Sequence, residues 1–289
     1  APLSRDGTSI VALTADGNAI LAGDGHLSLT IPAFLYQLHL DSQLLGDGNR
    51  HVIGLTVAGA PMVGLGHNGS VAWSHTSQTS DINDYYADQV VLDDATGRPM
   101  GTRFQGDVQP LTEIDETYDV SDALGSEPGQ RTISRWVTAQ GRPLFSLEGN
   151  ESNADDPAAV NIFGRWIVAA DVDGDGVISA ITGAGSHYGE KYFIEGVLGW
   201  GEANNVDEWY LAHQKIASYS QHFVAADTSG NILYSPFQAM PCRNYLPRGA
   251  DGVPLDGASP QRLIDGTLYP SFTVTHDAEH RIPTGTDDL

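Results

Sequence analysis

Tight turns between short apolar segments are the feature of this sequence that most restricts its fold. Four segments each carry a turn, such as Asp16-Gly17 or Asn68-Gly69, between two runs rich in Val, Ile, Leu and Ala. Asp-Gly, Asn-Gly and Ser-Gly pairs tolerate the positive φ angles of the turns that join antiparallel strands. Hairpins are therefore predicted at residues 9–22, 62–73, 166–181 and 222–234.

One helix is well indicated. Asn205 is a suitable N-cap, and Glu208 follows it by three residues, as in a capping box. Val206, Trp209 and Ile216 then fall near one face at helical spacing. Hairpins together with this helix indicate an α+β protein.

Two segments are less regular. Residues 81–89 fit either a strand or a short helix, and the pattern does not decide between them. Residues 241–289 are rich in Pro, Gly and Asp with little periodicity, which predicts a long surface excursion.

Charge and cysteine content exclude several classes of function. The 289 residues include 14 basic and 37 acidic side chains, for a net charge of −23. Such a chain repels nucleic acid and anionic membranes, so neither is an expected partner. Cys242 is the only cysteine, which excludes an internal disulfide and a zinc site built from several cysteines.

Several motifs follow one another in a fixed order along the chain, at residues 14–27, 31–36, 59–61, 66–73 and 226–232. The first two contain Thr-Ala-Asp-Gly, Gly-His-Leu and Ile-Pro-Ala-Phe-Leu-Tyr. The middle two contain Gly-Ala-Pro and Gly-His-Asn-Gly followed by Ala-Trp, and the last contains Ala-Asp and Gly-Asn-Ile. Together they resemble the catalytic chain of the penicillin acylase family of N-terminal-nucleophile hydrolases.

The resemblance implies a fragment of the family's catalytic chain rather than all of it. By this resemblance, residues 1–289 are part of a single catalytic domain. Residues 4–97 and 205–245 match the family pattern best. Residues 98–204 diverge, and residues 246–289 form a loop-rich, truncated end. The implied fold is an αββα sandwich of antiparallel sheets between helix layers, here incomplete.

The resemblance also implies a serine acyl-enzyme mechanism. An ungapped count back from residues 14–17 places Ser4 at the family's nucleophile, which is exposed by autocatalytic cleavage and uses its own α-amine as base. The backbone N–H of Ser77 falls on an oxyanion-hole donor, and His26 on a histidine that lines the site in some members. The alternative for His26 is a structural histidine on a strand edge.

The sequence departs from the family pattern around the nucleophile. Arg5 stands where the family has Asn, and residues 1–3 precede Ser4, so that its nitrogen lies in a peptide bond. A solvent-exposed serine in a short leader is the alternative for Ser4. The family's second catalytic group, an Asn in a segment resembling Asn-Ser-Asn-Asp-Pro, has no match before Leu289.

A structural calcium site is a further implication of the resemblance. Its ligands fall on Asp81, the carbonyl of Asn83, Asp84 and the carbonyl of Pro241, and an ordinary acidic turn is the alternative. A separate segment, residues 171–182, imitates the start of an EF-hand loop but has Thr at its twelfth position. We expect a turn there, with a calcium site as the alternative.

The sequence thus predicts an amide hydrolase that releases an acyl group from an N-acyl substrate such as a β-lactam, an acyl-homoserine lactone or a lipopeptide. Its partners would be this small substrate and a preceding chain of the same precursor. A periplasmic or extracellular location is expected from the resemblance. The alternative is a non-catalytic, acidic, calcium-stabilised binding module that retains the scaffold.

Overall fold

The computed structural model describes residues 8–24, 27, 30–44, 46–60, 62–122, 127–188, 190–217, 220–272 and 274–282. The chain forms two compact units. Unit 1 contains residues 1–82, 186–241 and 274–289, and unit 2 contains residues 83–185 and 242–273. Assignment of all these residues to a single catalytic domain stays a prediction. Within the described ranges, no helix has the length and apolar character needed to cross a membrane.

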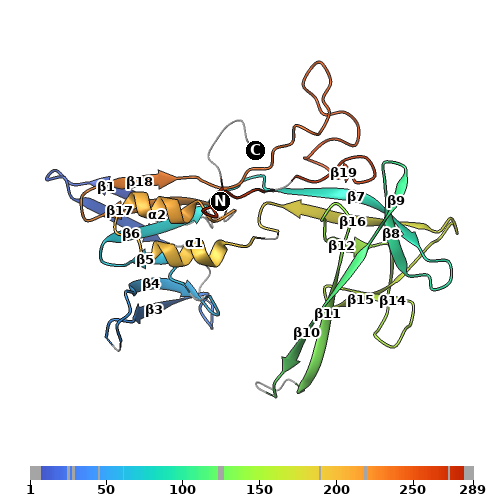
Figure 1. Ribbon diagram of the computed structural model, residues 1–289, viewed down its shortest axis with the longest axis horizontal. Coiled ribbons are helices and arrows are strands. Elements are labelled where there is room, and N and C mark those ends of the chain that lie inside the picture. Colours follow the sequence, from blue (N-terminus) through green and yellow to red (C-terminus); the bar gives the residue numbers. More distant parts are fainter. Residues whose placement is uncertain are drawn as a thin grey trace. The chain divides into compact units, whose positions relative to one another are not determined.

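Unit 1 combines antiparallel strands with two helices (Figure 1). Its elements are β1 (Thr8–Leu13), β2 (Ala19–Asp24), β3 (Leu35–Asp41), β4 (His51–Val57), β5 (Leu65–His67), β6 (Val71–Ser77), α1 (Phe193–Trp200), α2 (Val206–His213), β17 (Gln221–Asp227) and β18 (Ile232–Ser235). Six strands form one sheet in the order β18-β17-β6-β5-β4-β3, and β1 and β2 form a separate hairpin.

The turn dipeptides act in unit 1 as the sequence predicts. Gly17, Gly69 and Gly230 have φ angles of 84°, 91° and 85°, in the left-handed region that glycine adopts without strain. They close the β1–β2, β5–β6 and β17–β18 hairpins, each of which is antiparallel. Three of the four predicted hairpins are therefore confirmed.

The six-stranded sheet of unit 1 has helices on one face and the β1–β2 hairpin on part of the other. On one face, buried aromatic side chains of the sheet and helices pack together: the rings of Trp200 and Trp209 stack at 5.2 Å, and Phe223 of β17 lies 5.4 Å from Trp200. On the other face the β1–β2 hairpin lies against β6, where the hydroxyls of Ser9 and Ser74 are 2.9 Å apart. The layers of unit 1 are thus helices, sheet and hairpin.

Helix α2 begins with the cap that the sequence predicts. The side chain of Asn205 accepts a hydrogen bond from the N–H of Glu208 at 2.9 Å. The Glu208 carboxylate reaches back and accepts from the N–H of Asn204 at 2.8 Å, one residue earlier than in a standard capping box. Both groups satisfy N–H donors at the helix start.

Unit 2 consists of strands among the described residues (Figure 1). They are β7 (Asn83–Leu92), β8 (Pro99–Phe104), β9 (Asp107–Pro110), β10 (Thr112–Val120), β11 (Gly129–Val137), β12 (Leu144–Leu147), β13 (Gly149–Glu151), β14 (Ala159–Ile162), β15 (Arg165–Ala169), β16 (Val177–Gly185) and β19 (Ile264–Asp265). The main sheet has the order β12-β16-β7-β8-β9, with β19 parallel to β7, and β13-β15-β14 form a smaller sheet. Residues 81–89, left open by the sequence, lie largely in β7.

The hairpin predicted at residues 166–181 is wrong. Both strands exist as β15 and β16, but they belong to different sheets. β15 pairs instead with β14 across the turn Phe163-Gly164, whose φ angles are 49° and 86°. This turn is as tight as an Asn-Gly turn, although Phe gives no signal for it. The segment after β15 is longer and allows β16 to pair with β7.

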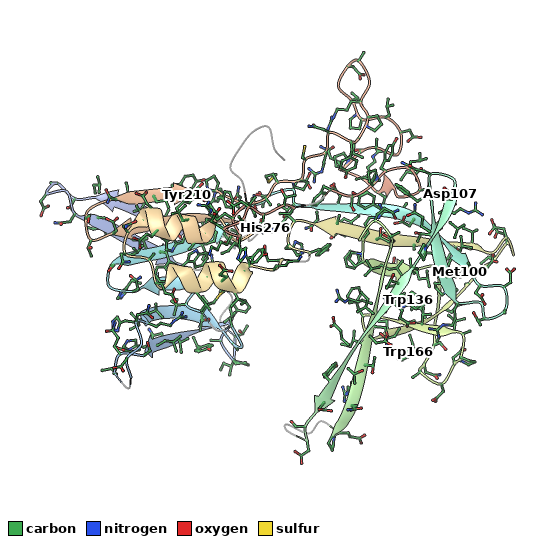
Figure 2. The ribbon with its side chains drawn as sticks, viewed as in Figure 1. Met100, Asp107, Trp136, Trp166, Tyr210 and His276 are labelled. Atoms are coloured by element: carbon green, nitrogen blue, oxygen red, sulfur yellow. The ribbon has the colours of Figure 1, made fainter. Side chains whose placement is uncertain are left out.

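The core of unit 2 surrounds a buried ion pair. Arg142 and Asp88 are both fully buried, and their side chains meet at 2.7 Å. The Arg142 guanidinium also donates to the Thr182 hydroxyl and to the carbonyl of Gly266, and it lies over the ring of Tyr86. Trp136 of β11, labelled in Figure 2, belongs to the main cluster of buried apolar side chains in this unit, which also contains Val90 of β7. The charges of this pair are therefore satisfied inside the sheet.

Candidate active site

Ser77 is the only predicted catalytic residue that falls within the described residues. It is the last residue of β6 and is exposed. Ser4 and His26, the predicted nucleophile and pocket histidine, lie outside the described ranges. Among the described residues, the candidate site is therefore defined by the geometry around Ser77 and by the position of β1.

The ladder between β6 and β17 fixes the direction of the Ser77 amide. Ser77 lies opposite Gln221, and the next residue, Gln78, donates its N–H to the carbonyl of Ser220 at 2.8 Å. Because N–H groups along an antiparallel strand alternate sides, the Ser77 N–H is directed away from β17. On that other side, β5 pairs with β6 no further than Trp73 among the described residues. Ser77 thus presents a backbone donor at the end of a strand.

Strand β1 runs opposite to β6 and begins near the same end of the sheet as Ser77. The Ser9 hydroxyl is 2.9 Å from that of Ser74, three residues before Ser77. The other end of the hairpin lies against the β17–β18 turn, where Gly230 closely approaches the carbonyl of Gly17. The first described residues of β1 therefore lie closer to the Ser77 end of β6 than the rest of the hairpin does.

Asn68, the asparagine of the Gly-His-Asn motif, connects a turn to a helix. Its side-chain oxygen accepts from the N–H groups of Ser70 and Val71 at 2.9 and 2.8 Å. Its side-chain nitrogen donates to the carbonyls of Gly201 and Ala203 at 3.1 and 2.7 Å, just after α1. The motif therefore has a structural role at this joint.

Asp227, from the Ala-Asp motif, has a comparable role at α2. One carboxylate oxygen accepts from the N–H groups of Ser229 and Asn231, both at 3.0 Å, within the β17–β18 turn. The other accepts from the N–H of Val206, the first residue of α2, at 3.2 Å. Burial raises the pKa of Asp227, but these hydrogen bonds, led by those from Asn231, outweigh it and lower the pKa overall. A helix N-terminus also favours a carboxylate.

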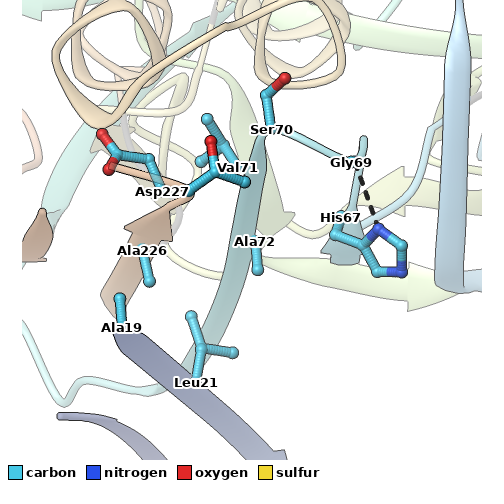
Figure 3. Close-up of a pocket in the computed structure, with 10 residues that line it drawn as sticks. Ala19, Leu21, His67, Gly69, Ser70, Val71, Ala72, Ala226 and Asp227 are labelled. Carbon is cyan, nitrogen blue, oxygen red and sulfur yellow. Dashed lines mark hydrogen bonds between the residues drawn. The ribbon is translucent and has the colours of Figure 1, made fainter. Parts of the chain in front are cut away.

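A pocket of ≈ 230 Å³ opens between the hairpin and the six-stranded sheet (Figure 3). Leu21, Ala72 and Ala226 contribute apolar side chains to it, and Figure 3 shows Ala19 of β2 beside Ala226 of β17. The pocket lies at the beginning of β6, whereas Ser77 lies at the end of that strand. It is therefore separate from the Ser77 amide.

Two histidines lie on the helix-covered face of the sheet, His213 fully buried and His75 half-buried, and no local pattern in the sequence indicates this. Burial lowers the pKa of His75 on β6 to about 4 and that of His213 on α2 to about 3. The ring of His213 packs 4.4 Å from Phe223 and stacks 5.1 Å from Trp209. Both imidazoles are therefore neutral at neutral pH.

Because both histidines are neutral in the folded protein, we expect the stability of the fold to decrease at acidic pH. Their pKa values are below the ordinary 6.5 when folded, so the unfolded chain binds more protons between pH 6.5 and about 4. The neutral histidines make their full contribution to the free energy of unfolding above pH 6.5. This free energy falls as the pH decreases, by up to about 1.4 kcal/mol per pH unit for each histidine. We expect His213→Phe to reduce this slope by roughly one such contribution, measured by urea unfolding at pH 7 and 5.5.

His67→Gln is the matched control for this experiment. His67 lies on β5 in the same sheet but is exposed, so its replacement shows whether the change in slope is specific to the buried ring of His213. An unchanged slope in His213→Phe would contradict the assignment of His213 as a buried neutral base.

The residues predicted to bind calcium are distributed over both units. Asp81 and Pro241 belong to unit 1, and Asn83 and Asp84 to unit 2. Asp84 is buried, and both of its oxygens accept from the Nε of Arg243, at 2.9 and 3.0 Å. A calcium ion at Asp84 would therefore share this carboxylate with a guanidinium. The calcium site stays a prediction.

The EF-hand-like segment forms a turn. Asp171 accepts from the N–H groups of Gly174 and Gly176, both at 2.8 Å, which fixes the loop through backbone donors. The carboxylates of Asp171, Asp173 and Asp175 can approach within 4.8 Å of one another. A plain turn stays the prediction for this segment, with a calcium site as the alternative.

Comparison with known proteins defines the class. The family model described as penicillin amidase matches residues 11–274, and the chain belongs to this family. The fold agrees: a thermostable penicillin G acylase from Alcaligenes faecalis matches with a TM-score of 0.51 and 23% identity, over 82% of this chain and 33% of that one. The predicted α+β fold class is thereby confirmed.

Curated relatives match shorter segments. Penicillin acylase 2 proenzyme of Pseudomonas sp. (strain SE83) is 40% identical over 93 residues, which is 32% of this chain and 11% of the relative. Acyl-homoserine lactone acylase QuiP of Pseudomonas aeruginosa is 29% identical over 147 residues, 49% of this chain and 15% of the relative. The matched segments thus span a small part of each relative's length.

Proposed function

We propose that the protein to which this chain belongs hydrolyses the amide bond of N-acyl substrates. The observation that supports this most directly is the Ser77 N–H, which is directed away from β17 at the end of β6. A backbone donor held in a rigid sheet is suited to stabilise the oxyanion of a tetrahedral intermediate. The family and the names of its relatives, an acyl-homoserine lactone acylase and a penicillin acylase proenzyme, support the substrate class.

In the proposed reaction, Ser4 becomes the first residue of its chain after cleavage of a precursor. Its hydroxyl attacks the acyl carbonyl carbon while its α-amine takes the hydroxyl proton, and the Ser77 N–H donates to the oxyanion. The C–N bond then breaks, the leaving amine takes the proton, and an acyl-serine ester remains. Water attacks this ester in the same way and releases the carboxylic acid.

Further parts of the proposal concern partners and stability. His26 would contribute to the acyl pocket together with a preceding chain of the same precursor. Calcium bound by Asp81, Asp84 and the carbonyls of Asn83 and Pro241 would have a structural role. Export to the periplasm or the medium is proposed from the family alone. β-Lactams, acyl-homoserine lactones and lipopeptides are the candidate substrates.

The test uses the intact precursor. Wild type and Ser4→Ala are compared on a panel of N-acyl amides, and their chains are sized by mass spectrometry. We expect Ser4→Ala to remain uncleaved and to lose at least about 1,000-fold in kcat/KM. Ser9→Ala, which changes another serine five residues further along the chain, should retain cleavage and activity.

Equal hydrolysis by wild type and Ser4→Ala, or none by either, would contradict the proposal. A chain that keeps residues 1–3 attached to Ser4 and hydrolyses no amide would favour the non-catalytic binding module. The residue that favours this second candidate is Arg5, which stands where the family has Asn.

A further inference from the structure

We propose that His39, Asp41 and His51 form a binding site for Zn²⁺ or a similar transition-metal ion. His39 and Asp41 lie on β3 and His51 on β4, in unit 1. The site involves neither Ser77 nor the residues predicted to bind calcium.

The strands bring the three side chains together. His39 and Asp41 are two residues apart on β3 and therefore face the same side of the sheet. His51 lies directly opposite Asp41 in the antiparallel β3–β4 ladder. One potential ligand atom from each residue lies within 4.8 Å of the others. Among the described residues, this is the one such group that contains histidine.

The distances between the ligand atoms suit a small metal ion. Asp41 Oδ2 is 2.8 Å from His51 Nδ1 and 4.0 Å from His39 Nε2. In a tetrahedral zinc site with bonds of about 2.0–2.2 Å, ligand atoms are roughly 3.3 Å apart. The observed distances bracket this value, so small side-chain rotations would allow all three atoms to bind one ion.

The carboxylate at the centre of the site is held in place. Asp41 Oδ1 accepts from the N–H groups of Gln43 and Leu44 at 2.8 and 3.2 Å, which leaves Oδ2 directed at His51. The hydrogen bond with His51 lowers the pKa of Asp41, opposed by partial burial. Such bonds to the atom that does not bind metal orient a metal ligand.

The site is accessible to solvent. The side chains of His39 and His51 are 45% and 42% exposed, and that of Asp41 is 12% exposed. The nearby positive charge of Arg50 is paired with Glu202 at 2.7 Å. Two imidazoles and one carboxylate favour Zn²⁺ over Ca²⁺ or Mg²⁺, which prefer oxygen ligands. Water would complete the coordination.

The experiment measures Zn²⁺ binding to the full-length protein at pH 7.5 by equilibrium dialysis in chelator-buffered solution. We expect His51→Gln and Asp41→Asn each to bind one equivalent less than the wild type at the same free Zn²⁺ concentration. Loss of a direct ligand should weaken binding by at least the roughly 10- to 100-fold that loss of a supporting partner costs. His67→Gln, a control on β5, should bind as the wild type does.

Co²⁺ provides a second measurement. Bound at this site it should give the intense visible absorption of tetrahedral coordination, absent in His39→Gln. Thermal unfolding without metal verifies that each variant is folded. If Zn²⁺ binding is the same in wild type, His51→Gln and Asp41→Asn, the site does not exist. If Ca²⁺ competes equally with Zn²⁺, the bound ion reflects the acidic surface, and the proposal is also wrong.

Discussion

In the proposed mechanism, replacing Ser77 by proline removes an oxyanion donor and is expected to lower kcat for amide hydrolysis by about 100- to 1,000-fold. Proline has no N–H, and the Ser77 N–H is not needed by the β6–β17 ladder because it is directed away from β17. Proline is tolerated in strands at such positions. The substitution therefore removes a donor while the sheet is retained.

Ser77→Ala is the matched control for Ser77→Pro. It removes the hydroxyl but retains the backbone N–H, so activity within a few fold of wild type is expected. Both variants are compared with the wild type in the intact protein, with circular dichroism to verify folding. Equal losses in the two variants would assign the effect to the side chain and contradict the backbone role.

Arg142→Met is expected to destabilise unit 2 by about 3–5 kcal/mol, the cost of leaving one member of a buried ion pair without its partner. Asp88 would remain buried without its cation, although the hydroxyl of Thr182 still donates a hydrogen bond to it. The carbonyl of Gly266 would also lose a donor. Urea unfolding measures the change.

Two further variants separate the effect of the buried ion pair from the effect of removing an arginine. In Arg142→Met/Asp88→Asn neither position carries a charge, so the loss should be smaller than in Arg142→Met alone. Arg165→Met removes an exposed pair with Glu151, whose distance is 2.9 Å, and should cost less than about 1 kcal/mol. A loss in Arg142→Met no larger than in Arg165→Met would contradict a structural role for the buried pair.

Features decided by neighbouring residues could be predicted from the sequence. The cap of α2 depends on Asn205 and Glu208, which are three residues apart, and the turn at Gly69 depends on its own dipeptide. Both were predicted because a local hydrogen bond or a local φ angle determines the structure. The family motifs were found for the same reason, since each is a short continuous segment.

Features decided by distant contacts were missed. Helix α1 has no side-chain cap at Tyr192, and it exists because it packs closely on α2. A Cβ at Gly196 or Gly199 would lie only 2.7 Å from side-chain atoms of Ile216 or Ala212. The sequence of residues 193–200 contains no pattern that indicates this close packing.

The same limit applies to the candidate site. The sequence identified Ser77 through a resemblance, but the direction of its N–H follows from the pairing of β6 with β17, which are far apart in the chain. The metal-binding group requires that His51 lie opposite Asp41, and this register comes from the β3–β4 pairing. Strand register is set by the whole sheet rather than by a motif.

Asn68 and Asp227 have a consequence for how proteins of this kind diverge. Each of these side chains fastens a tight turn to the end of a helix, and neither contributes its side-chain atoms to the proposed reaction. Their loss would loosen the joint between the helices and the sheet whether or not the protein is an enzyme. A related protein that lost its nucleophile would therefore be expected to retain both residues. Its membership of the family could still be recognised from them after the activity was lost.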